Sequence, residues 1–301
     1  LLKAPVDLLW NGGIGTYVKS SKESHADVGD KANDLLRVDG RELRAKVVGE
    51  GGNLGMTQLG RVEYGLNGGK SNTDFIDNAG GVDCSDHEVN IKILLGEIVG
   101  AGDMTGKQRN KLLVEMTDAV GGLVLGNNYK QTQALSLAER RARERVSEYK
   151  RLMTALEAAG KLDRALEFLP TDDELNERAA NGLGLTRPEM SVLISYSKID
   201  LKESLLKSLV PDDEYLAREM ETAFPPLLAK KFGEPMRRHR LKREIVSTQI
   251  ANDLVNHMGI TFVQRLKEST GMSAANVAGA YVIVRDLFRL PHWWKQIEAL
   301  D

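Results

Sequence analysis

The stretch VDLLWNGGIG (residues 6–15) places a short apolar run directly before three glycines, and AKVVGEGGN (residues 45–53) repeats that arrangement. Apolar runs that end in glycine turns and alternate with helix-compatible stretches are typical of parallel βαβ units. A weaker run of the same kind is DFI (residues 74–76). The sequence therefore predicts three buried strands, with helices between them near residues 27–36 and 56–66.

Glycine divides the chain into two parts. Residues 1–90 contain 15 of its 29 glycines, which indicates tight turns and close backbone approaches in that part. Beyond about residue 84, apolar residues recur at helical spacing. Capping boxes begin at Thr105, Thr171 and Thr186, each with a glutamine or glutamate three residues later.

These patterns predict a parallel α/β segment followed by an all-α helical C-terminal domain, with the whole chain mostly helical. We expect the boundary near residue 100. Residues 101–301 are then the helical domain.

Composition narrows the range of functions. Among 301 residues, 41 basic and 43 acidic side chains give a net charge of −2, which provides no general attraction to nucleic acid or anionic membrane. The single cysteine, Cys84, cannot form a disulfide within the chain, and no apolar run reaches the length of a membrane span. We expect a cytoplasmic protein. Because the chain lacks an initial Met, we also expect it to be a piece of a longer one.

Two basic runs, residues 140–145 and 237–243, raise the alternative of nucleic-acid binding. The first is interleaved with glutamates, and the second lacks stacking aromatic residues. A solvated helix face or an intersubunit ion-pair site is the favoured interpretation. The pair Trp293 and Trp294 predicts a hydrophobic anchor for the last helix, with a partner contact as the alternative.

The glycine loops do not complete a G-x-G-x-x-G dinucleotide fingerprint. More specific is NAGGV (residues 78–82), where Asn78 and two glycines can present an amide and bare backbone to a ligand. An Asx-type turn explains the same residues. Ser85 and Glu88 read as a capping box for a helix over 86–99, although the Ser85 hydroxyl could instead meet a bound anion at the helix N-terminus.

Other kinds of catalytic site are disfavoured. The chain has no G-x-S-x-G elbow and no phosphate-binding loop of the P-loop type. Its five histidines are scattered, and there is no cysteine cluster. We therefore expect no metal site.

Three segments resemble the NAD-binding domain of glutamate dehydrogenases. EGGN (residues 50–53) is similar to that family's E-G-A-N, and residues 78–85 are similar to its N-A-G-G-V-x-x-S. NGGIGTYVK (residues 11–19) and the long helical tail resemble the large bacterial NAD-specific enzymes. Leu54-Gly55 departs from the Gly-Pro of the small enzymes, and Asp86-His87 departs from their Tyr-Phe.

The resemblance implies that residues 1–100 are the C-terminal part of an NAD-binding α/β domain, a partial Rossmann-like (dinucleotide-binding) segment. It also implies a role for each matching residue. Gly12, Gly13, Gly52, Asn53 and Asn78 would bind the NAD cofactor. The hydroxyl of Ser85 would bind the substrate carboxylate. The family's lysine-bearing G-G-G-K-G segment and its aspartate have no counterpart here, so we expect no catalytic residue in this fragment.

The function implied is part of an NAD-dependent glutamate dehydrogenase, an oxidoreductase that oxidatively deaminates L-glutamate to 2-oxoglutarate and ammonia. The implied partners are glutamate or 2-oxoglutarate, the remainder of the parent chain, and further copies in a homo-oligomer. The alternative is a non-catalytic helical interaction or oligomerisation module. We expect the isolated fragment to be inactive.

Overall fold

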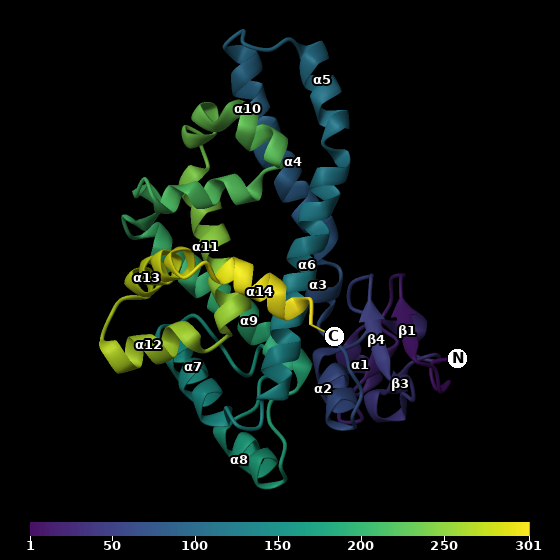
Figure 1. Cartoon of the computed structure of the whole chain (residues 1–301). Coiled ribbons are helices and arrows are strands. Elements are labelled where there is room, and N and C mark those ends of the chain that lie inside the picture. The colour runs from purple at the N-terminus through teal and green to yellow at the C-terminus, as the bar shows by residue number, and fades with distance from the viewer. Residues whose placement is uncertain (301) are drawn as a thin grey trace. The chain divides into compact units, whose positions relative to one another are not determined.

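The computed structural model describes residues 1–300, which group into two compact units that interleave along the sequence. Unit 1 contains residues 1–82 and 126–196, and unit 2 contains residues 83–125 and the described residues from 197 onward. The chain is mostly helical, with a few short parallel strands (Figure 1). Helices that extend from one unit into the other are α4 (Ala79–Gly100), α6 (Thr117–Arg140) and α9 (Arg187–Leu206).

Unit 1 contains all of the named strands. Its elements are β1 (Leu8–Asn11), β2 (Val18–Lys19), α1 (His25–Val28), η1 (Lys31–Asn33), β3 (Val38–Asp39), η2 (Gly40–Glu42), β4 (Val47–Glu50), α2 (Gln58–Leu66), α3 (Asp74–Asp77), α7 (Val146–Ala158) and α8 (Asp172–Ala180), where η marks a 3₁₀ helix.

The strands form two parallel pairs, β1 with β4 and β2 with β3. Figure 1 shows β1 and β4 side by side. One side of these strands packs on a small core of buried side chains: Val18, Leu43, Ala45, Val48, Met56 and Tyr64. The Tyr64 hydroxyl donates to the carbonyl of Ala45 at 2.7 Å, which ties α2 to the start of β4.

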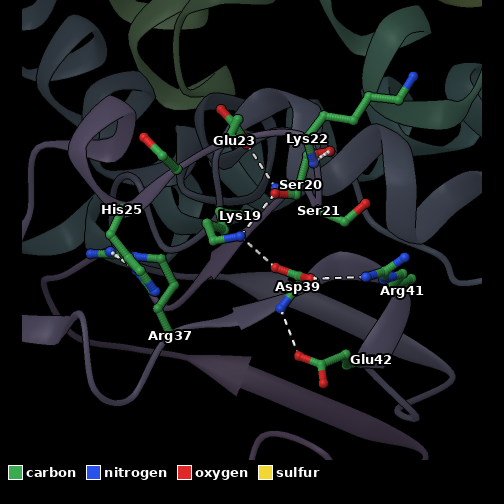
Figure 2. A network of polar contacts seen from close by, with 12 residues as sticks. Lys19, Ser20, Ser21, Lys22, Glu23, His25, Arg37, Asp39, Arg41 and Glu42 are labelled. Carbon is green, nitrogen blue, oxygen red and sulfur yellow. Dashed lines mark hydrogen bonds and ion pairs between the residues drawn. The ribbon is translucent and has the colours of Figure 1, made fainter.

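The β2–β3 pair carries a buried charge. Lys19 lies opposite Asp39 in the register, and its Nζ donates to Asp39 Oδ1 at 2.5 Å and to the Ser20 carbonyl at 3.1 Å. Figure 2 shows this pair within a network that also includes Arg41 and Glu42. Because Lys19 already has two partners here, we interpret the network as structural.

Unit 2 is built from helices. Besides its parts of α4, α6 and α9, it contains α5 (Gly106–Glu115), η3 (Val210–Asp212), η4 (Leu216–Ala223), α10 (Pro226–Arg237), α11 (Lys242–Met258), α12 (Phe262–Thr270), α13 (Ala274–Leu287) and α14 (Leu290–Glu298). Its core forms where η4, α11 and α13 pack on one another, around side chains such as Leu254 and Val282.

A charged network joins the three packed elements of unit 2. Arg285 of α13 donates to Glu219 of η4 at 2.5 and 2.9 Å and to Asp253 of α11 at 2.8 Å. Asp253 also accepts from the Tyr281 hydroxyl at 2.9 Å and pairs with His257 at 3.0 Å. These contacts fix the relative register of α11 and α13.

Most predicted elements are confirmed. β1 and β4 are the first two predicted strands, but only β4 is mostly buried, since Leu8 and Trp10 of β1 are exposed. α2 is the helix near 56–66, and the capping boxes at Thr105 and Thr171 have both reciprocal hydrogen bonds. Of the predicted anchor pair, Trp294 stacks on His257, with ring centroids 3.8 Å apart, while Trp293 is exposed. Within residues 1–300, no helix combines the length and apolarity that crossing a membrane requires.

Three predictions of local structure are wrong. Residues 74–76 belong to the helix α3, because a short apolar run does not by itself distinguish strand from helix. The helix near 27–36 is only the short α1 followed by the 3₁₀ turn η1. Ser85 does not cap a helix over 86–99, since it lies within α4, which already begins at Ala79.

Candidate functional site

The glycine loops after β1 and β4 begin side by side. Asn11 and Glu50 are partners in the strand register, and the carbonyl of Asn11 accepts hydrogen bonds from Gly51 N at 2.8 Å and Gly52 N at 3.0 Å. The two loops therefore leave the sheet at its carboxyl end. This is the edge at which parallel α/β sheets bind ligands.

The backbones of the two glycine loops approach each other closely at this edge of the sheet. A Cβ added to Gly52 would lie 2.2 Å from the carbonyl oxygen of Gly13, so only glycine permits this approach. A Cβ on Gly13 would meet no atom within 4 Å, and one on Gly12 would meet only the Trp10 ring, at 3.4 Å or more. Gly12 and Gly13 thus present exposed backbone with open space above it.

Asn78 contacts the loop after β4, although it lies 25 residues beyond Asn53 in the sequence. Its Nδ2 donates to the Gly52 carbonyl at 3.3 Å and to the side-chain oxygen of Asn53. Asn78 follows α3 directly and precedes α4, so it does not lie at the end of a strand as the sequence predicted. The structure nevertheless brings it to Gly52 and Asn53.

A buried ion pair shapes the loop that carries Asn53. Glu50 is fully buried, and its carboxylate accepts from Arg61 Nε at 2.6 Å and Arg61 Nη2 at 3.0 Å. The same carboxylate accepts from Met56 N at 3.0 Å. Burial raises the pKa of Glu50, while its contacts with Arg61 act in the opposite direction. Glu50 thereby joins the two ends of the loop.

Two further carboxylates hold this loop from α3. Asp74 accepts from Leu54 N at 2.8 Å, and Asp77 accepts from Glu50 N at 2.9 Å. Leu54 has a φ of 59°, a left-handed conformation that a leucine adopts only when its surroundings impose it. Strained backbone of this kind gathers at functional sites.

Ser85 lies on α4, in unit 2, and its side chain is exposed. The other five predicted residues belong to unit 1. Contact between Ser85 and the corner formed by Gly13, Gly52, Asn53 and Asn78 therefore stays a prediction.

Sequence reasoning missed the residues that support this corner: Asn11, Glu50, Arg61, Asp74 and Asp77. Each is polar and sits beside a glycine loop or an apolar run, but nothing in the sequence indicates which charges are buried together. A carboxylate at the last position of a buried strand, as at Glu50, was the one available signal, since a buried charge needs a partner.

The comparisons with known proteins define the class. A family model described as "Bacterial NAD-glutamate dehydrogenase, catalytic domain" matches residues 1–138. A second model, "Glutamate dehydrogenase, C-terminal", matches residues 182–301. Both matches are to glutamate dehydrogenases.

Curated relatives narrow the class to one family. Proteins named NAD-specific glutamate dehydrogenase align over all 301 residues, with 86% identity in Pseudomonas aeruginosa, 62% in Halomonas elongata and 45% in Mycobacterium tuberculosis. Over its full length the chain is therefore similar to bacterial NAD-specific glutamate dehydrogenases. It spans 19%, 19% and 18% of the respective relatives' lengths.

Proposed function

We propose that this chain supplies one wall of the nicotinamide and amino-acid pocket in a cytoplasmic NAD-dependent glutamate dehydrogenase. The observation that carries the proposal is the meeting of Gly13, Gly52, Asn53 and Asn78 at the carboxyl ends of parallel strands. The relatives' names support NAD as the cofactor and glutamate as the substrate. In this proposal, the pair of β1 and β4 is part of a Rossmann-like sheet.

The residues fit a flat cofactor ring, because the backbone at Gly12 and Gly13 is exposed and no side chain fills the space above Gly13. When bound there, NAD would supply the acceptor for the hydride that leaves the substrate. Asn78 uses its Nδ2 to orient Asn53. The Asn78 Oδ1 and the Asn53 amide nitrogen are the atoms that we assign to cofactor binding.

Ser85 has a separate role in the proposal, binding the substrate carboxylate through its hydroxyl. The chain then binds and orients the cofactor and substrate. We assign the proton-transferring lysine and aspartate of the reaction to the rest of the parent chain, and we assign no catalytic residue to these 301 residues.

Kinetics of the full-length enzyme test the cofactor site. The substitution Asn78→Ala removes the hydrogen bonds to the Gly52 carbonyl and to Asn53. Each lost hydrogen bond costs about 1 kcal/mol. We expect KM for NAD to rise roughly tenfold, as 1.4 kcal/mol corresponds to a factor of ten. Asn181→Ala, an exposed asparagine at the end of α8, is the matched control and should leave KM unchanged. An unchanged KM for NAD in Asn78→Ala would contradict the proposal.

We also propose that residues 101–301 serve in assembly or regulation of the enzyme. The supporting observation is the set of large apolar side chains exposed near the C-terminus: Ile283, Leu287, Phe288, Trp293, Ile297 and Leu300. Light scattering of the full-length enzyme tests this. Leu287→Glu with Ile297→Glu should lower the oligomeric mass, and an unchanged mass at high dilution would argue against an assembly role.

A further inference from the structure

A groove of about 590 Å³ lies within unit 1, over the face of β1 and β4 that points away from the Val48 core. The C-terminal half of α6 forms its other wall. Residues that define it include Leu8, Trp10, Val47, Lys70, Tyr129 and Arg140. Gly13, Gly52, Asn53 and Asn78 do not line it, although Asp77, which supports their corner, does.

The apolar residues of this face are unusually exposed. Leu8 is 56% exposed, Trp10 59% and Val47 41%, whereas Val48, on the opposite face, is 3% exposed. Parallel strands are found almost only where both faces of the sheet are covered, usually by helices. An uncovered parallel sheet face therefore indicates that something packs on it in the intact protein.

The groove also has polar features that a covering segment must satisfy. Ser71 lines it and is 3% exposed, and within residues 1–300 its hydroxyl has no hydrogen-bond partner. Charge of both signs lies at the rim, where Lys70 Nζ is 3.7 Å and Arg187 Nη1 is 3.2 Å from the carboxylate of Glu139. A buried hydroxyl without a partner is costly, so the occupant should bring a hydrogen-bonding group to Ser71.

We propose that this groove is the docking site of an amphipathic helix from the same parent polypeptide, outside these 301 residues. The chain spans 19% of the P. aeruginosa relative, so roughly four-fifths of such a polypeptide is available to cover it. Another parallel strand beside β1 would need a crossover connection, usually a helix, that packs on a sheet face. The apolar side of the helix contacts Leu8 and Trp10, and its polar side brings a hydrogen-bonding group to Ser71.

Site-specific photocrosslinking in the full-length enzyme tests the proposal. A photoreactive benzoylphenylalanine placed at Leu8 should crosslink in high yield to a peptide of the same polypeptide that lies outside these residues. Mass spectrometry identifies that peptide, and mixed isotope-labelled and unlabelled subunits distinguish crosslinks within one polypeptide from those between copies. The same probe at Leu35, which is fully exposed and outside the groove, is the control.

A second readout uses the native side chain. Hydroxyl-radical labelling of Trp10 in the folded full-length enzyme should be at least tenfold slower than labelling of the same residue after denaturation. A crosslink to a second copy, a crosslink within residues 1–301, or rapid labelling of Trp10 would each overturn the proposal. Neither readout depends on cofactor binding, so the result is independent of the proposed activity.

Discussion

Arg61 shows how one buried residue supports a loop that it does not belong to. It donates twice to Glu50 and lies 3.5 Å from Asp74, and these two carboxylates hold the backbone amides of Met56 and Leu54. The positively charged guanidinium therefore holds in place the two carboxylates that fix the loop carrying Asn53.

Removing Arg61 should be severely destabilising. Arg61→Met leaves Glu50 charged, buried and without its principal partner, a change that typically costs about 3–5 kcal/mol. Urea denaturation measures the free energy of unfolding. The double variant Arg61→Met, Glu50→Gln should recover part of the loss, because it removes the unpaired charge. A loss below about 1 kcal/mol in the single variant would show that the ion pair is not central to the fold.

The two glycines that meet at the corner should respond differently to the same added methyl group. Gly52→Ala places a Cβ against the Gly13 carbonyl and should lower the free energy of unfolding, since backbone must move to admit it. Gly13→Ala meets open space, so stability should be retained while KM for NAD in the full-length enzyme rises. Thermal unfolding and steady-state kinetics of both variants separate the effects. Equal KM values in Gly13→Ala and the parent enzyme would place the cofactor elsewhere.

For single residues, the sequence predicts where the backbone turns, but it does not predict which side chains hold those turns in place. Gly52 and Asn78 were identifiable because glycine and asparagine mark sharp backbone turns. Their supports, Glu50, Arg61 and Asp74, come from three separate elements. Which of many charged residues are buried together is decided only when those elements pack.

For helices and strands, the predictions are confirmed where a segment is long enough to show a repeating spacing of apolar residues. α9, α11 and α13 lie beyond residue 84, where apolar residues recur at helical spacing. β1 ends just before Gly12, and β4 ends just before Gly51. Prediction failed for short segments, as at residues 74–76, where three residues do not define a period. It also misplaced the start of α4, because Ser85 matches a capping pattern inside a helix that Ala79 already begins.

The charged network between α11 and α13 predicts that the free energy of unfolding of unit 2 falls at acid pH. Burial alone would raise the pKa of Asp253, but hydrogen bonds with His257 and Arg285 outweigh it and hold that pKa at about 2, against an ordinary 3.8. A lowered pKa stabilises the fold above the ordinary value, and the stabilisation is lost as pH falls from 3.8 toward 2. The shift corresponds to about 2 kcal/mol.

Denaturation at several pH values measures this effect in the 301-residue chain. Between pH 4 and pH 2, Asp253→Asn should reduce the dependence of the free energy of unfolding on pH. Asp103→Asn, an exposed carboxyl in a turn, is the control and should reproduce the parent curve. Identical slopes for the parent chain and Asp253→Asn would mean that its hydrogen bonds do not stabilise the carboxylate.

For the whole molecule, the prediction of a mostly helical chain is confirmed, and the division at residue 100 stays a prediction. Composition and period predict the helical character, but the interleaving of units 1 and 2 requires contacts between segments far apart in sequence. The isolated 301 residues should show no glutamate-dependent NADH formation, because we assign the proton-transfer residues to the rest of the parent chain. NADH absorbance measures this, and a signal that Ser85→Ala abolishes would contradict it.

The helices α4, α6 and α9 each pass from one compact unit into the other without interruption. One recombination breakpoint therefore cannot exchange unit 1 or unit 2 between related genes, since each unit is encoded by two separated stretches. A crossover inside any of these helices would also have to preserve its helical phase. We therefore expect the gene segments for unit 1 and unit 2 to be inherited together. Chimaeric proteins joined at residue 100 should fold less often than chimaeras joined outside residues 1–301.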